Sequence, residues 1–188
     1  MGGLLDIWHV DPSGLIFHDQ TAEIGRPVAL LEHPNVAEEF VTVSDTLVVL
    51  WRHVRGGELK FQAIPTPSQR EFGLLTCAAK AKVGTDCVIA VGCEEGTVFM
   101  FDIDRLGEWR SVYENRRAIS ALSLSSTGYL FIGCDGSHTL IKHDVNGKWK
   151  KPQTGDSPPN STTVDGSIDL DGPICAIYSG DSHKTLAA

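Results

Sequence analysis

The sequence predicts an all-β protein, and three observations lead to this fold class. The apolar clusters are short, rich in β-branched and aromatic residues, and bounded by glycine, proline, aspartate or serine. Such clusters are typical of strands joined by turns. No stretch of the chain repeats apolar residues at helical spacing. The 188 residues also include 19 glycines and 9 prolines, which indicates many turns.

We expect strands along the whole chain, at residues 4–10, 15–18, 28–32, 39–43, 46–53, 59–64, 74–79, 87–91, 97–103, 109–113, 119–123, 129–132, 139–145, 174–178 and 185–188. Segments 47–51 (LVVLW) and 98–101 (VFMF) within them are apolar on both faces. A strand with one face in water alternates apolar and polar residues. These segments therefore predict sheets that are stacked face to face.

Four segments of the chain are similar to one another: GLLDIWH at 3–9, DTLVVLWR at 45–52, GTVFMFD at 96–102 and HTLIKHD at 138–144. Their matching residues Trp8, Trp51, Phe101 and His143 are separated by 43, 50 and 42 positions. A repeat of this length with four short strands is typical of a β-propeller blade. The repeat predicts four-stranded antiparallel blades, about four blades' worth in all.

These segments resemble the third blade strand of the WD-repeat β-propeller family, whose pattern is roughly Asp-Gly-x-apolar-x-apolar-Trp-Asp. Trp8 and Trp51 match the aromatic residue, whereas Asp102 and Asp144 match the acid. The best match is 120–144, SALSLSSTGYLFIGCDGSHTLIKHD. The resemblance covers nearly the whole chain, and it implies a WD-repeat-like propeller, complete or partial.

The sequence departs from the family pattern in two ways. The Gly-His dipeptide that precedes the first strand of such repeats is missing from every unit, and no unit keeps Trp and Asp together. The buried hydrogen-bond network of His, Ser or Thr, Asp and Trp that such repeats often carry is therefore incomplete in every blade. The repeat as a whole, and not any single motif, supports the resemblance.

The repeat divides the chain 1–188 into a partial blade at 1–20, blades at about 21–64, 65–113 and 114–150, and a partial blade at 173–188. Three arrangements follow: the two halves join into a four-bladed ring, a partner's strands complete an open propeller, or the chain is a fragment of a longer propeller. We favour the fragment, because four-bladed rings are rare. An open propeller would leave strand edges that invite pairing with a partner.

Residues 150–172 interrupt the repeat. This segment, KKPQTGDSPPNSTTVDGSIDLDG, is rich in proline, serine, threonine, aspartate and glycine, and it has almost no apolar content. Such a composition cannot bury enough surface to fold by itself. We expect an exposed, flexible insertion between the outer strand of one blade and the inner strand of the next.

Composition limits the kinds of partner. The formal net charge of −8 would repel a nucleic-acid backbone, and no window is long and apolar enough for a membrane-spanning helix. Five cysteines without a CxxC pair are typical of reduced, buried thiols in the cytosol or nucleus. We therefore expect a cytoplasmic or nuclear protein that binds neither nucleic acid nor a membrane.

The stretch AVGCEEGTVFMFDID at 90–104 suggests a metal or phosphate site when it is read alone. It aligns with residues 131–144, which contain the last of the four repeated segments, so Cys93 and Cys134 occupy the same position in two blades. Zinc would need about four converging ligands, Glu94 and Glu95 would repel a phosphate, and Gly96 fits a hairpin turn with positive φ. We expect a turn here, with no metal and no cofactor.

No catalytic residue is expected either. The chain has no Gly-x-Ser-x-Gly motif, and no serine or cysteine has a predictable base. His143 and Asp144 are adjacent, but neighbouring residues of a strand point to opposite faces. The sequence therefore favours a protein that is not an enzyme.

The turns carry the candidate partner-binding residues. In a propeller of this topology, hairpins between the second and third strands share one face with the loops between blades. That face would gather Asp45, Glu94, Glu95, Asp135 and His138 from hairpins, and Arg70, Arg116 and Arg117 from loops. Mixed charge on a rigid ring suits a protein or peptide ligand, with the arginines as main contacts.

The resemblance implies a non-catalytic scaffold for protein–protein interaction that contributes to the assembly of a multiprotein complex. Its partners would be other proteins or peptides, including a chain that completes the propeller. Fold alone does not fix function. The alternative is a propeller-fold enzyme, a hydrolase or lyase with a site at the central channel.

Overall fold

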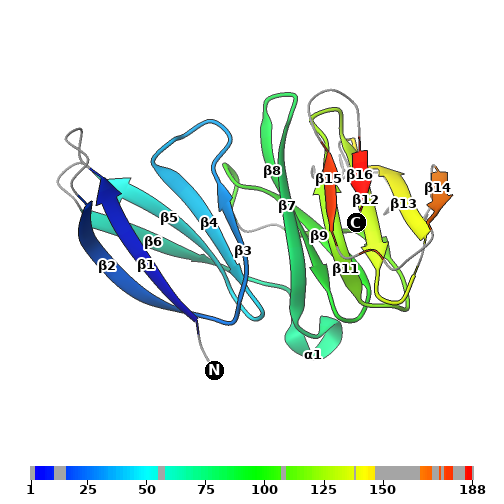
Figure 1. Cartoon of the computed structure of the whole chain (residues 1–188), viewed down its shortest axis with the longest axis horizontal. Coiled ribbons are helices and arrows are strands. Elements are labelled where there is room, and N and C mark those ends of the chain that lie inside the picture. Colours follow the sequence, from blue (N-terminus) through cyan, green and yellow to red (C-terminus); the bar gives the residue numbers. More distant parts are fainter. Residues whose placement is uncertain are drawn as a thin grey trace, which may run out of the picture. The chain divides into compact units, whose positions relative to one another are not determined.

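The computed structural model describes residues 3–10, 16–54, 58–106, 109–137, 139–146, 166–170, 174, 176–179 and 185–187. The chain forms two compact units, Met1–Thr66 and Pro67–Ala188. Nearly every element in them is a strand (Figure 1). The fold is all-β, as the sequence predicts. None of the helices in the described part of the chain is long and apolar enough to cross a membrane.

The unit Met1–Thr66 contains two antiparallel sheets. β1 (Gly3–Val10) pairs with β2 (Ile16–Gly25). The first four-stranded sheet follows in chain order, as β3 (Pro27–Glu32), β4 (Glu39–Ser44), β5 (Val48–Val54) and β6 (Glu58–Ile64). Buried Val49, Trp51 and Leu59 pack with Leu5 and Phe40, so the two sheets share a core.

The unit Pro67–Ala188 begins with the short helix α1 (Gln69–Phe72). The second four-stranded sheet is β7 (Leu75–Val83), β8 (Asp86–Cys93), β9 (Thr97–Asp102) and β10 (Arg110–Glu114). The third is β11 (Ile119–Leu124), β12 (Tyr129–Cys134), β13 (Thr139–Asp144) and β14 (Gly166–Asp169). The pair β15 (Ile177–Ser179) and β16 (Thr185–Ala187) comes last.

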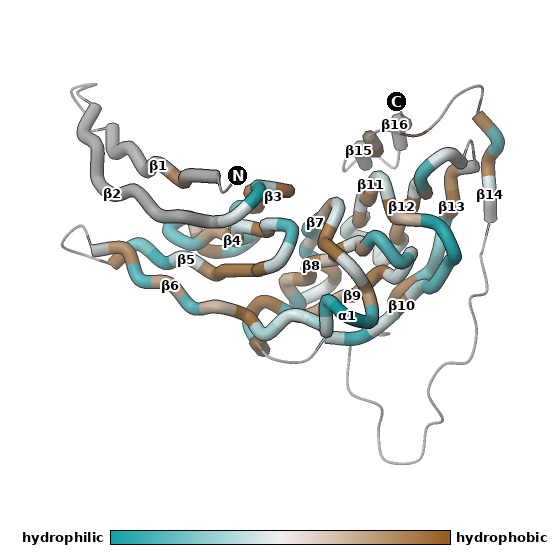
Figure 2. Tube along the Cα trace, turned by 90° about the horizontal axis from the view of Figure 1, so that it is seen from below, coloured by the Kyte–Doolittle hydropathy of each residue, from teal (hydrophilic) through white to brown (hydrophobic). Residues whose placement is uncertain are grey.

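The second and third sheets are stacked on one large core. Every residue of β8 and of β9 is buried, and the core between the sheets includes Val88, Met100, Leu130 and Ile132. Figure 2 shows the hydrophobic residues of β8 and β9 in brown and the hydrophilic residues of α1 in teal. Strands that are apolar on both faces therefore lie between packed layers, which confirms the expected stacking.

The repeated segments of the sequence form the third strand of each four-stranded sheet. In β5, β9 and β13 the matching residues are opposite a residue of the second strand, Trp51 opposite Phe40, Phe101 opposite Ile89 and His143 opposite Leu130. The register is thus the same in all three sheets. The repeat found in the sequence corresponds to a repeated position in the structure.

Two of these repeated positions carry a buried hydrogen bond. The Trp51 indole donates to the Thr42 hydroxyl over 2.8 Å. The Nε2 atom of His143, a fully buried residue, lies 3.0 Å from the Val112 carbonyl. A buried polar group needs a partner: Trp51 finds it on the neighbouring strand β4 of its own sheet, whereas His143 of the third sheet finds it on β10 of the second sheet.

Residues 166–169 differ from the sequence expectation. The sequence predicts an exposed insertion after the outer strand for these residues, but they form β14, the fourth strand of the third sheet. β14 pairs with β13 from Thr139↔Asp169 to Lys142↔Gly166. The segment 147–165 therefore precedes the outer strand in sequence. The single apolar residue of β14, Ile168, is 61% exposed, so main-chain pairing and not apolar burial holds this strand.

Candidate partner-binding rim

A hairpin between β8 and β9 forms the centre of the candidate site. Gly96 has a φ of +84°, which confirms the expected positive-φ turn. Glu94, in the same hairpin, makes two hydrogen bonds with Leu74. Its main-chain N–H donates to the Leu74 carbonyl over 2.9 Å, and its carboxylate accepts from the Leu74 N–H over 3.0 Å. The Glu95 N–H donates to the Phe72 carbonyl over 3.3 Å. The hairpin is thus fixed to the loop that follows α1.

The loop between β10 and β11 connects this hairpin to the next one. The Asn115 N–H donates to the Gly96 carbonyl over 2.9 Å, and the Asp135 N–H donates to the Ala118 carbonyl over 2.7 Å. The Arg117 guanidinium donates to the Gly136 carbonyl over 3.0 Å. Residues 69–74, 94–96, 115–118 and 135–136 therefore form one hydrogen-bonded surface, which we call the rim.

The loop between β10 and β11 packs so closely on Gly96 that this position has no room for a side chain. A Cβ atom added there would lie 2.5 Å from the Asn115 carbonyl oxygen and 2.6 Å from the Arg117 carbonyl oxygen. Beside this contact, the Asn115 amide donates to the Tyr113 hydroxyl over 3.0 Å and approaches the Cys134 sulfur to 3.3 Å. The loop between β10 and β11 is therefore in contact with the β8–β9 hairpin at Gly96 and with Cys134 at the end of β12.

The predicted site residues fall into three groups. Six of the eight belong to the rim: Arg70, Glu94, Glu95, Arg116, Arg117 and Asp135, all of them exposed. Asp45 lies in the corresponding turn of the first sheet, in the other unit, where its N–H donates to the Arg26 carbonyl over 3.0 Å. His138 lies outside the described residues.

The six rim residues differ in whether their side chains make hydrogen bonds within the rim. Glu94 and Arg117 hold the loops through main-chain groups, as given above. No hydrogen bond or ion pair of the Arg70, Glu95, Arg116 or Asp135 side chain is found among the residues that the structure describes. Both signs of charge are thus exposed on fixed backbone. Sequence reasoning missed Asn115 and Tyr113, because nothing in their local pattern shows a contact with a hairpin about twenty positions away.

The cysteines close to the rim are unreactive thiols. Burial raises the pKa of Cys77 and of Cys93 to about 12, and burial also raises the pKa of Cys134. Cys93 is fully buried, whereas Cys77 keeps some exposed surface, so the assignment is strongest for Cys93. A protonated thiol is a poor nucleophile and a poor metal ligand. These side chains act as small apolar residues at the ends of strands.

Comparison with models of known protein families and with curated protein sequences gives no match for this chain.

Proposed function

We propose that the chain is a non-catalytic scaffold for protein–protein interaction, and that its sheets are blades of a WD-repeat-like β-propeller or of part of one. The observation that carries the proposal is the rim, in which four separate loops are hydrogen-bonded into one surface with exposed charges of both signs. A rigid surface loses little entropy when a partner binds. Charged side chains on it select that partner.

A repeated joint between sheets supports the propeller arrangement. Each four-stranded sheet has a register shift in its first strand, after Pro27, Leu75 and Ile119. In the second and third sheets the residue at the shift donates to a main-chain carbonyl further along the chain: Thr76 to that of Ile119, the first residue of β11, over 2.6 Å, and Ser120 to that of Ile174, which precedes β15, over 2.9 Å. A joint that recurs between each sheet and the segment that follows it is what successive blades require.

Two glycines make the same joint possible. A Cβ atom added to Gly92 would lie 2.7 Å from the Ile119 side chain, and one added to Gly133 would lie 2.7 Å from the Ile174 side chain. Ile119 at the start of β11 and Ile174 before β15 therefore each pack directly on a glycine. In the first sheet, Val28 takes the place of Thr76 and Ser120, and Val43 takes the place of Gly92 and Gly133. The donating hydroxyl and the glycine are therefore features of the second and third sheets.

The partner would be another protein or a peptide, including a chain that completes the propeller. It would bind in the cytoplasm or nucleus, with no cofactor, no nucleic acid and no membrane involved. Among the described residues Cys77, Cys87, Cys93 and Cys134 are free thiols, and free cysteines are typical of proteins in a reducing compartment. Rim arginines are the expected main contacts, as arginine is enriched among residues that dominate binding energy.

Affinity purification tests this proposal. The tagged full chain serves as bait in lysate, and the bound proteins are quantified for the wild type and for Arg116→Glu. Arg116 is exposed, and its guanidinium makes no contact that the fold needs among the described residues. We expect a stoichiometric partner with the wild type, and about fivefold less of it with the variant.

The matched control is Lys82→Glu, a charge reversal beside the opposite hairpin of the same sheet. Lys82 is exposed, and it lies opposite Cys87 in the β7–β8 pair. Lys82→Glu therefore changes the net charge by the same amount as Arg116→Glu but leaves the rim unchanged. The control should retain the partner. Equal recovery by both variants, or equal loss, would contradict the assignment of binding to the rim.

A further inference from the structure

The strand β6 forms one edge of the first four-stranded sheet, whose strand order is β3-β4-β5-β6. It pairs with β5 over seven residues, Glu58–Ile64, without a register shift. Among the strands that the structure describes, none pairs with its other side. The main-chain N–H and C=O groups of an edge strand can pair with a further strand. The sheet can therefore be extended at β6.

The outer strands of the other two four-stranded sheets are protected against such pairing. The pairing of β10 with β9 has a register shift between Ser111 and Tyr113, and β14 has only four residues. Bulges and short strands are two ways in which proteins block the edges of their sheets. β6 has neither of them, and it is the longest of the three outer strands.

The hydrogen bonds of β5 show which main-chain groups of β6 point outward. The His53 N–H donates to the Glu38 carbonyl over 2.9 Å, on the side of β4. Because successive residues of a strand bond to opposite sides, Arg52 bonds to β6, where Lys60 lies opposite it. The same alternation along β6 leaves the main-chain groups of every second residue pointing away from β5. We call this set the open edge: Leu59, Phe61 and Ala63.

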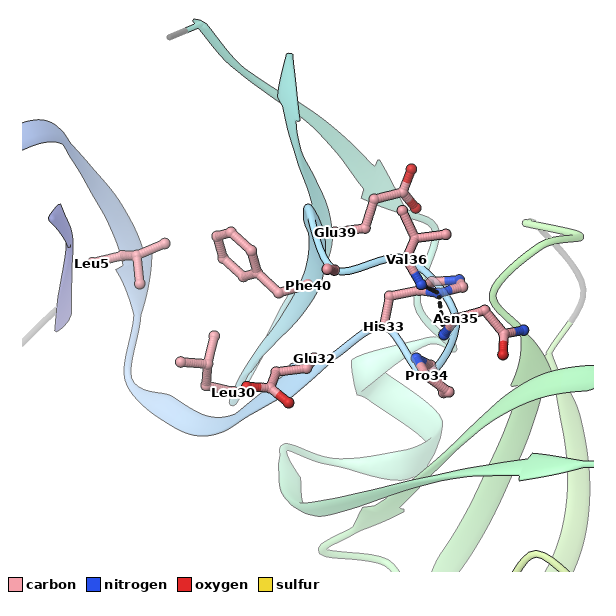
Figure 3. A pocket seen from close by; sticks show the side chains of 10 residues that line it. Leu5, Leu30, Glu32, His33, Pro34, Asn35, Val36, Glu39 and Phe40 are labelled. Carbon is pink, nitrogen blue, oxygen red and sulfur yellow. Dashed lines mark hydrogen bonds between the residues drawn. The ribbon is translucent and has the colours of Figure 1, made fainter. Parts of the chain in front are cut away.

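The centre of the open edge carries an exposed aromatic ring. Phe61 is 69% exposed, the highest value among the large apolar side chains that the structure describes. Its ring centroid lies 5.5 Å from that of Trp51, which in turn stacks on Phe40 with the centroids 6.0 Å apart. Figure 3 shows Phe40, at the other end of this row, beside a cavity of about 660 Å³. The row of rings thus begins at a cavity and ends in solvent at the open edge.

The open edge is complementary to a second copy of itself. When two β6 strands pair antiparallel with Phe61 opposite Phe61, each Leu59 lies opposite an Ala63, so all three residues of the open edge are paired and a large side chain meets a small one. Lys60 then lies opposite Gln62, so no two lysines meet. A shift of the register toward Leu59 would place Lys60 opposite Lys60, and like charges directly opposite each other are destabilising.

We propose that β6 is the interface of a symmetric homodimer, in which the first sheets of two copies form one continuous antiparallel sheet centred on Phe61. Residues directly opposite each other point to the same face of a sheet, so the two aromatic rows meet at the two-fold axis. A two-fold contact uses the same surface of both copies. The open edge and the rim belong to different units, so this inference does not rest on the proposed function.

Sedimentation velocity of the full chain over a range of concentrations tests the proposal. We expect a monomer–dimer equilibrium with a Kd on the order of 100 μM, because the pairing of one strand is a small interface. Phe61→Lys should raise this Kd at least about tenfold, since it removes the ring contact and places two like charges at the two-fold axis.

Leu30→Lys is the matched control. Leu30 is 63% exposed on β3, at the opposite edge of the same sheet, and the substitution makes the same change in net charge. The Kd of this control should stay within about twofold of the wild-type value, because distant sites act independently. Circular dichroism checks that both variants are folded.

Amide hydrogen exchange measured by NMR identifies the paired residues. At concentrations well below the Kd, the amides of Lys60 and Gln62 should exchange slowly because they donate to β5, whereas those of Leu59, Phe61 and Ala63 should exchange fast. At about ten times the Kd, exchange of these three open-edge amides should be about fourfold slower than in the dilute sample. Exchange of the Lys60 and Gln62 amides should not slow by this factor.

Should Phe61→Lys fail to fold, Ala63→Pro decides the matter. Proline is tolerated in an edge strand where the N–H faces away from the sheet, and here it removes one donor of the open edge, so the Kd should again rise about tenfold. A chain that stays monomeric at about 1 mM, equal effects of Phe61→Lys and Leu30→Lys, or slowed exchange confined to other amides would overturn the proposal. Protection of the open edge by a different protein, with no dimer formed, would overturn it as well.

Discussion

Gly96 is the residue on which the rim depends most directly. Its φ of +84° suits glycine, and a Cβ atom there would lie 2.5 Å from the Asn115 carbonyl oxygen. We expect Gly96→Ala to lower the free energy of unfolding by about 2–4 kcal/mol, since strain at positive φ and steric overlap add to each other. Urea unfolding followed by circular dichroism measures this value.

Gly84→Ala is the control for Gly96→Ala. Gly84 also has a positive φ, +64°, but an added Cβ atom would have nothing within 4 Å. The cost at Gly84 should be only the backbone term of about 1 kcal/mol. Equal losses at the two positions would show that the loop at Asn115 does not pack on the hairpin.

The thiol of Cys93 gives a prediction about pH. Burial raises its pKa from an ordinary value of 9.0 to about 12. As the pH rises above 9, the unfolded chain loses this proton first, so stability is full below about pH 9 and is lost as the pH rises toward 12. Between pH 8 and pH 10, Cys93→Ala should lose about 1 kcal/mol less stability than the wild type.

Urea unfolding of both proteins at the two pH values, in the presence of a reductant, checks this difference. Cys93→Ala has its own cost at pH 8 because it leaves a small cavity, and that cost cancels when the change between the two pH values is compared. If the wild type and the variant lose the same amount of stability, the Cys93 thiol is exposed to solvent in the folded chain.

The joint between sheets makes a prediction at the scale of the element. Thr76→Val keeps the shape of the side chain but removes the donor to the Ile119 carbonyl. The carbonyl then loses its 2.6 Å hydrogen bond, which should cost about 1–2 kcal/mol. Ser120→Ala removes the corresponding bond to the Ile174 carbonyl and should cost about 1 kcal/mol.

Thr127→Val is the control for these substitutions. The Thr127 hydroxyl lies 2.9 Å from the Ser125 hydroxyl in an exposed turn, where water replaces the lost partner, so its removal should cost less than about 0.5 kcal/mol. Denaturant unfolding of all three variants decides the matter. A loss at Thr127 as large as that at Thr76 would mean that the joint adds nothing specific.

Elements with strong apolar patterns could be predicted from the sequence, and weakly apolar ones could not. The fully buried strands β8 and β9 were predicted because they are continuous apolar runs, and every other predicted strand also overlaps a strand of the structure. The missed strand β14 has the sequence GSID, and its pairing with β13 comes from a distant part of the chain. Helix α1 was missed because QREF has no apolar period.

At the scale of the whole molecule, the repeat predicted the number of strands per sheet. Trp51, Phe101 and His143 share one register in three sheets, and the sequence aligned the same residues. The repeat also places the 94–96 and 135–136 turns at one end of adjacent sheets. It could not show that Glu94 and Arg117 are bound to main-chain groups, because those contacts depend on the distance between loops from different sheets.

Hydrogen–deuterium exchange of the full chain, with and without the protein that it captures, tests the central claim most directly. The claim is that the rim binds the partner. Binding should slow exchange about tenfold or more at the 94–96, 115–118 and 135–136 amides, because bound surfaces lose access to water. Turns at the opposite end of the second sheet, 84–85 and 103–105, should exchange at the same rate in both samples. Protection of 84–85 and 103–105 without protection of the rim would contradict the account.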